Sequence, residues 1–187
     1  MRSASSFEST TNPLGLLLEG APPARLLEAH LDAGPQLPEL IDAAALLRAE
    51  EHAAASALLD DLLAGTTDAA EIRSDALRVD DATLRVRARA RYLLLVAGHG
   101  AGSPDDLAGL RRRMAETEQV ADEFARYTEG RQARLWSAEI AYRIWTLTGE
   151  REDCRNAERS LRATIARLEN DPALTGHLDT LLSGLDC

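Results

Sequence analysis

Apolar residues recur every three to four positions along most of the chain, which is the spacing of an amphipathic α-helix. A clear example is the stripe formed by Leu107, Leu110, Met114 and Ala121. Stretches that alternate strictly between apolar and polar residues, as half-buried strands do, are nearly absent. The pattern therefore predicts an all-α protein of antiparallel helical hairpins, arranged as a helical repeat or as an irregular bundle.

The same spacing, with turn and capping residues, sets the expected helix boundaries. We expect helices to end at Gly65, Gly98 and Gly149, because glycine readily adopts the left-handed cap conformation. The polar residues 50–52 interrupt one long apolar stripe, so that stretch is open to interpretation as two helices. The expected ranges are 22–32, 38–63, 68–78, 81–97, 103–127, 131–148, 151–168 and a last helix from 171.

The helix expected over 131–148 has two apolar seams instead of one. Trp136 and Ile140 lie on the first seam, and Tyr142 and Trp145 lie on the second. A helix that is apolar on two sides is normally covered from two sides, so we expect an inner position for it. The last helix has a single apolar stripe and suits the end of a stack.

Five features of this region follow a family pattern. They are an early aromatic (Trp136), an Ala-Tyr pair (Ala141-Tyr142), a turn glycine (Gly149), a small residue (Ala157) and a closing proline (Pro172). Residues 131–172 thereby resemble a tetratricopeptide repeat. The resemblance implies a superhelical groove that binds peptides or partner proteins.

The composition indicates a cytoplasmic protein without membrane spans. No apolar run approaches the roughly 18 residues that a membrane-spanning helix needs. Residues 1–20 are expected to form a flexible leader, and their apolar burst is too short for a secretory signal. The rest divides into an acidic helical subdomain over 21–79 and an arginine-rich, repeat-like subdomain over 80–187, which we expect to fold as one cooperative domain.

Charge is distributed unevenly along the chain. All 21 basic residues are arginines, and the net charge is −10. Residues 1–83 hold 5 arginines and 15 acids, whereas residues 84–167 hold 16 arginines and 12 acids. A GC-rich genome explains the absence of lysine, but it does not explain the segregation. The guanidinium fork grips carboxylates and phosphates, so the segregation indicates charge-directed recognition within the chain or with a partner.

Two groups of arginines lie close together in the sequence and form the candidate site. On a helix, one face of the first group would also carry an aromatic ring able to stack on a base. One interpretation is that these arginines pair with acids of residues 1–83 or of a partner protein, and the alternative is that they track nucleic-acid phosphates. The candidate residues are Arg85, Arg87, Arg89, Arg91, Tyr92, Arg111, Arg112 and Arg113.

The sequence contains no recognisable motif for catalysis, for metal binding or for a cofactor. The histidines are scattered, and neither Cys154 nor Cys187 has a neighbour at metal-ligand spacing, so we expect no metal and no cofactor. A bridge between the two cysteines is geometrically possible, but we expect Cys154 to behave as a small buried apolar residue. A small-molecule enzyme or sensor would need a pocket near Trp136, Tyr142 and Trp145.

These observations favour a non-enzymatic interaction protein. It would bind a protein partner, or a second copy of itself, through an arginine-lined surface in the groove between the helices expected over 81–97 and 131–148. The alternative is a DNA-binding protein whose acidic N-terminal half masks the arginine cluster.

Overall fold

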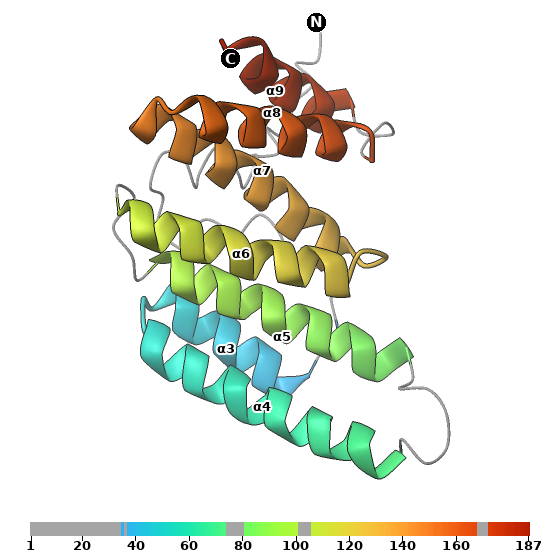
Figure 1. Cartoon of the computed structure of the whole chain (residues 1–187). Helices are drawn as coiled ribbons and strands as arrows, with labels where there is room; N and C mark the ends of the chain where they lie inside the picture. The colour runs from blue at the N-terminus through green and yellow to red at the C-terminus, as the bar shows by residue number, and fades with distance from the viewer. Residues whose placement is uncertain (1–34, 36, 74–80, 101–105, 168–171) are drawn as a thin grey trace, which may run out of the picture.

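The protein is a stack of helices that pack side by side in chain order (Figure 1). The computed structural model describes residues 35, 37–73, 81–100, 106–167 and 172–187. Within these residues every regular element is a helix, which confirms the all-α prediction. The expected leader and the helix expected over 22–32 lie outside this part. The helices are α3 (Pro38–Arg48), α4 (His52–Arg73), α5 (Asp81–Gly100), α6 (Leu107–Glu123), α7 (Thr128–Thr148), α8 (Arg151–Ile165) and α9 (Pro172–Ser183).

The polar residues 50–52 do divide the first long stretch into two helices. α3 ends at Arg48, and α4 begins at His52. Between them Glu50 adopts a φ of 61°, the left-handed conformation that commonly follows a helix end. The chain reverses there, and α4 returns against α3.

Two of the three glycines that were expected to end helices do not do so. α4 continues through Gly65 to Arg73, so the separate helix expected over 68–78 is wrong, and α5 continues through Gly98. Only Gly149 takes the expected cap conformation, with a φ of 63°. A glycine in a helix interior costs about 1 kcal/mol relative to alanine, which the packing of a long helix offsets.

α7 has the expected inner position. It packs against α5, α6 and α8, and the Trp136 side chain is completely buried. The ring of Trp136 stacks on Tyr92 and meets the edge of His99, with a centroid separation of 5.1 Å in both cases. One turn further along the same seam, Ile140 lies beside Leu110 of α6. On the second seam, Tyr142 packs partly buried against the main core, and Trp145 is partly exposed.

One apolar core connects the described helices. Its buried side chains run from Leu40 on α3, through Leu93 on α5, to Leu178 on α9. A boundary near residue 80 stays a prediction. None of the helices in the described part combines the length and the apolar character needed to cross a bilayer.

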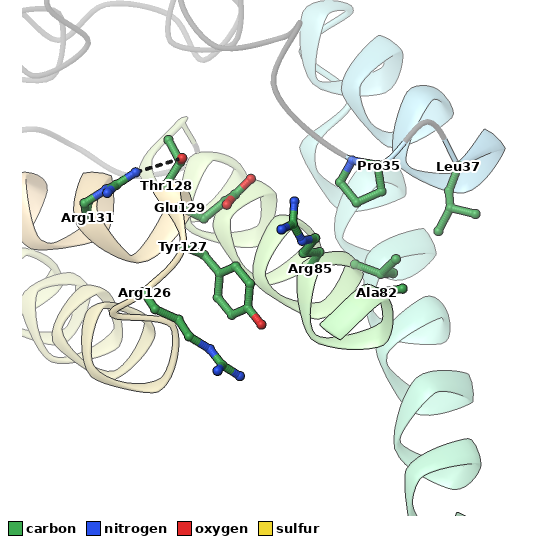
Figure 2. Close-up of a pocket in the computed structure, with 10 residues that line it drawn as sticks. Pro35, Leu37, Ala82, Arg85, Arg126, Tyr127, Thr128, Glu129 and Arg131 are labelled. Carbon is green, nitrogen blue, oxygen red and sulfur yellow. Dashed lines mark hydrogen bonds between the residues drawn. The ribbon is translucent and has the colours of Figure 1, made fainter. Parts of the chain in front are cut away.

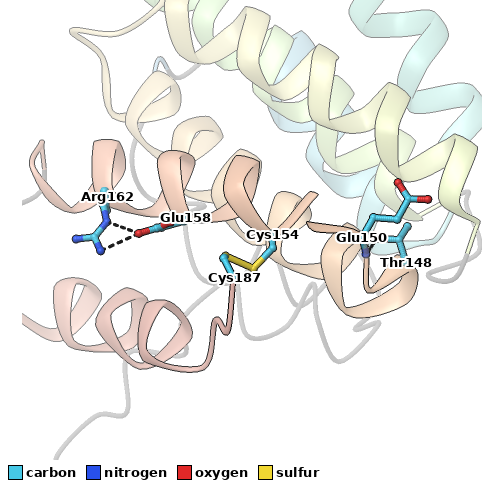
Figure 3. Close-up of a disulfide and its surroundings, with 6 residues drawn as sticks. All are labelled: Thr148, Glu150, Cys154, Glu158, Arg162 and Cys187. Carbon is cyan, nitrogen blue, oxygen red and sulfur yellow. Dashed lines mark hydrogen bonds and ion pairs between the residues drawn. A yellow bond between two sulfur atoms is a disulfide. The ribbon is translucent and has the colours of Figure 1, made fainter. Parts of the chain in front are cut away.

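A disulfide joins Cys154 on α8 to Cys187 beyond α9 (Figure 3). The expectation of two unlinked cysteines is therefore wrong, although Cys154 is as buried as expected. The bridge forms because α9 turns back along α8, which brings the end of the chain to the start of that helix. The two Cα atoms lie 5.7 Å apart, within the usual range for a disulfide.

The turn between α6 and α7 depends on Gly130, which is buried. A Cβ atom at this position would collide with the backbone carbonyl of Phe124. We expect Gly130→Ala to lower the free energy of unfolding by about 2 kcal/mol, because overpacking against backbone forces the turn to shift. Chemical denaturation measures the change.

Gly98→Ala is the matched control, because a Cβ there meets open space. It should stabilise the protein by about 0.5–1 kcal/mol. Equal effects of the two substitutions would show that the turn is not tightly packed.

Candidate partner-binding site

The first group of predicted site residues lies in the first half of α5, but its members differ in exposure. Arg85 is exposed, and Arg87 and Arg91 are partly buried. Arg89 and Tyr92 are buried, with 5% and 0% of their surface accessible. The run therefore does not form one open surface, because α5 is covered by α4, α6 and α7.

Tyr92 cannot stack on a nucleic-acid base in this structure. Its ring lies against Trp136, and the Arg89 guanidinium lies 5.5 Å from the ring centroid. Burial raises the pKa of the Tyr92 hydroxyl well above its usual value, so the side chain is neutral. The His99 ring lies against Trp136 and is also not free to stack on a base. Burial, and then the charge of Arg113, lower the pKa of His99 to about 3, so its side chain is neutral near pH 7.

The second group, Arg111 to Arg113, lies apart from the first group. In an antiparallel hairpin, residues equally distant from the turn meet, so the start of α6 faces the end of α5. Arg113 is accordingly buried near His99, and Arg111 binds Asp153 of α8 at 3.3 Å. Arg112 is exposed. The expected single cluster of both groups is therefore wrong.

Most carboxylate partners of these arginines belong to the arginine-rich half itself. Arg87 lies 3.8 Å from Glu123, and Arg89 lies 3.9 Å from Glu129. The acidic N-terminal half contributes one such ion pair among the residues that the structure describes, between Asp81 and Arg85. Asp81 Oδ2 accepts a hydrogen bond of 2.7 Å from Arg85 Nε.

A cavity of about 690 Å³ opens beside Arg85 (Figure 2). Three segments meet there: residues before α3, the first turns of α5, and the turn from α6 into α7. The cavity therefore lies between the start of α5 and the start of α7, the two helices between which the sequence analysis predicted a binding surface; that surface stays a prediction. Its lining comprises Pro35, Leu37, Ala82, Arg85, Val86, Arg126, Tyr127, Thr128, Glu129 and Arg131.

Hydrogen bonds fix the side chains around this cavity. The Tyr127 hydroxyl donates to Asp81 Oδ1 at 2.8 Å, which ties the α6–α7 turn to the start of α5. Hydrogen bonds from Arg85 and then Tyr127 lower the pKa of the Asp81 carboxyl. The Arg126 guanidinium lies 5.2 Å from the centroid of the Tyr127 ring, and Arg131 donates to Thr128 Oγ1 at 3.3 Å.

Arg126 and Arg131 were missed as site residues. They are 13 or more positions beyond Arg113, and they are not part of a run of arginines. Neither forms an ion pair within the described residues. The available signal was their position at the α6–α7 turn, which a hairpin must bring next to the start of α5.

The described residues give less support to a small-molecule pocket near Trp136 or to a metal site. The space beside Trp136 is filled by Tyr92 and His99, while Tyr142 and Trp145 meet edge to face at 5.4 Å. In the residues that the structure describes, no three His, Cys, Asp or Glu side chains gather closely enough to hold a metal ion.

We find no protein-family model, no curated protein and no solved structure that matches this chain. We therefore infer function from the geometry and charge of the site.

A buried carboxylate and a histidine link α7 to α9, away from the arginines. Glu139 Oε1 lies 2.7 Å from His177 Nε2, and the Glu139 side chain is 1% exposed. Burial raises the pKa of Glu139, and the hydrogen bond to Glu139 raises the pKa of His177. The pair holds the last helix against the inner helix.

We expect the charge of His177 to stabilise the fold at mildly acid pH. A raised folded-state pKa gives a contribution that is complete below the unfolded value of about 6.5 and is lost as pH rises through the folded value. His177→Gln, which keeps a neutral donor, should therefore cost about 1–2 kcal/mol near pH 6 and much less near pH 9. Urea denaturation across this range measures the difference, and a pH-independent cost would contradict the pairing.

Proposed function

We propose that this chain is a non-enzymatic interaction protein that binds acidic groups of a protein partner through the arginines at the end of the α5–α7 groove. The observation that carries the proposal is that Arg126 and Arg131, which form no ion pair within the described residues, line one cavity beside Arg85. Guanidinium groups bind carboxylates through paired, directional hydrogen bonds. A second copy of the chain, which has 31 acidic residues, is the other candidate partner.

The opposite end of α6 is less suited to an acidic partner. Arg111 is already bound to Asp153, and Glu150 and Glu152 line the cavity of about 440 Å³ beside it. These carboxylates repel other anions at short range. The lining of this cavity therefore has more carboxylates than arginines, whereas the lining of the cavity beside Arg85 has more arginines than carboxylates.

Nucleic-acid binding is the alternative function. Arg85, Arg112 and the turn arginines are exposed cations that phosphates could reach. Against it, Tyr92 is buried and His99 is partly buried with its ring against Trp136, and base stacking is a main contribution to single-strand binding. The net charge of −10 also opposes long-range attraction of DNA.

Binding of two polyanions separates the alternatives. Fluorescence anisotropy with labelled polyglutamate and with single- and double-stranded DNA, each over a salt series, compares their affinities. The proposal predicts that polyglutamate binds more tightly than DNA at equal salt and that R126Q/R131Q weakens it about tenfold. Tighter DNA binding with a steep salt dependence would favour the alternative. Absence of binding to either polymer at low salt would contradict both functions.

The proposal includes a cytoplasmic location and a helical repeat similar to the tetratricopeptide family. The disulfide is the observation that most directly challenges this location, because disulfides persist mainly in oxidising compartments. Alkylation of cysteine thiols in intact cells measures the redox state of Cys154 and Cys187. A reduced pair supports the cytoplasm, and a fully oxidised pair contradicts it.

A further inference from the structure

The cavity beside Arg85 has two walls of different chemistry (Figure 2). Guanidinium groups of Arg126 and Arg131 lie on the side of the α6–α7 turn. Pro35 and Leu37 lie on the other side, before α3, and Ala82 and Val86 add further apolar surface from α5. A ligand in this cavity would therefore meet cations and apolar groups at the same time.

The cationic side has an excess of positive charge. The two carboxylates beside the cavity are each held by an arginine, Asp81 by Arg85 and Glu129 by Arg89. Arg126 and Arg131 remain, and neither forms an ion pair within the described residues, although the charge of Arg126 contributes to the lowered pKa of Asp81. Their contacts with Tyr127 and Thr128 hold the guanidinium groups in place without neutralising them.

Size and construction also suit a ligand larger than a single ion. A volume of about 690 Å³ lies within the usual range for sites that take small organic ligands or several side chains. The Tyr127–Asp81 hydrogen bond and the packing of Gly130 on Phe124 fix the turn that carries Arg126 and the first turn of α7, which carries Arg131. A preformed site loses less conformational entropy on binding than a flexible one.

Building on the proposed function, we propose that this cavity binds a short segment of the partner protein in which acidic side chains stand next to a large apolar side chain. The carboxylates would bind Arg126 and Arg131, and the apolar side chain would cover Pro35, Leu37 and Val86. A nucleic-acid backbone fits this site less well, because phosphates and sugars have no large apolar group that could pack against Pro35, Leu37 and Val86.

Three acetylated and amidated hexapeptides test the inference on the full chain by isothermal titration calorimetry. EELEEL has both features, EEGEEG has the same charge without apolar side chains, and QQLQQL has the apolar side chains without charge. We expect EELEEL to bind at least tenfold more tightly than either of the others. Equal affinity for EELEEL and EEGEEG would overturn the apolar part of the inference.

Variants then locate the site. R126Q/R131Q should weaken EELEEL binding about tenfold, and V86S should remove the preference for EELEEL over EEGEEG. The matched control is R155Q/R159Q, which removes the same charge from exposed positions on α8 and should change affinity less than twofold. Circular dichroism confirms that each variant is folded.

The outcomes distinguish this inference from the proposed function. If R126Q/R131Q weakens polyglutamate but V86S has no effect on peptide preference, the function stands and the two-sided site is wrong. If R126Q/R131Q and R155Q/R159Q weaken EELEEL equally, the interaction follows total charge and the cavity is not the site. If EELEEL does not bind at millimolar concentration, the inference is wrong whatever polyglutamate does.

Discussion

Replacing Trp136 with alanine is expected to lower the free energy of unfolding by about 4 kcal/mol, the largest effect of any single substitution considered for this fold. Truncating a buried aromatic typically costs about 3–5 kcal/mol, because contacts are lost and a cavity remains. Trp136 is completely buried on the inner helix and contacts two rings of α5, Tyr92 and His99. Its loss would separate α7 from α5, which together flank the arginine-lined cavity.

Two further substitutions serve as controls for Trp136. Trp136→Phe should cost less than half as much, because the indole nitrogen makes no hydrogen bond within the described residues. Trp145→Ala lies on the same helix but is partly exposed, and it should cost about 1–2 kcal/mol. Urea denaturation followed by circular dichroism measures all three. A cost for Trp136→Ala that does not exceed the cost for Trp145→Ala would contradict the central position of α7.

Reduction of the disulfide is expected to cost about 3–4 kcal/mol of stability. The bridge closes a loop of 33 residues, and the chain-entropy model assigns a cost of this size to releasing such a loop in the unfolded state. In the folded state, α9 would then be held by Leu178, which is fully buried, and by the His177–Glu139 contact. We therefore expect α9 to detach first when the bridge is open.

Denaturation with and without a dithiol reductant measures this effect, and hydrogen exchange locates it. Amides of α9 should lose protection before those of α7. The double variant C154S/C187S, measured without reductant, should behave like the reduced protein. An unchanged unfolding midpoint after verified reduction of both thiols would contradict a structural role for the bridge.

The order and type of the helices could be predicted because the apolar period is long and consistent. The wrong helix boundaries were predicted from single glycines, each of which was expected to end a helix. Gly149 ends a helix because its φ is positive, but Gly65 and Gly98 lie within helices. The sequence does not show which glycine adopts the cap conformation, since packing along the following turn decides it.

The candidate site could be predicted only in part, for a geometric reason. Arg85 does line the cavity proposed as the site, because the start of α5 borders that cavity. Arg89 carries the same charge but points into the helix stack, and Arg111 is at the far end of the hairpin. Identifying Arg126 and Arg131 requires knowing where the turn between α6 and α7 falls. The disulfide could not be predicted for the same kind of reason, because it depends on the return of α9 along α8, which places Cys187 beside Cys154.

We propose that Arg126 in the α6–α7 turn and Arg131 in the first turn of α7 form the surface that receives an acidic partner. A nuclear magnetic resonance titration with EELEEL, observing backbone amides and arginine Nε–H groups, tests it most directly. We predict that the largest shifts occur at Arg126, Arg131 and the residues between them, with smaller shifts at Val86. Largest shifts at Arg111 and Arg112, or no shifts at millimolar peptide, would contradict the claim.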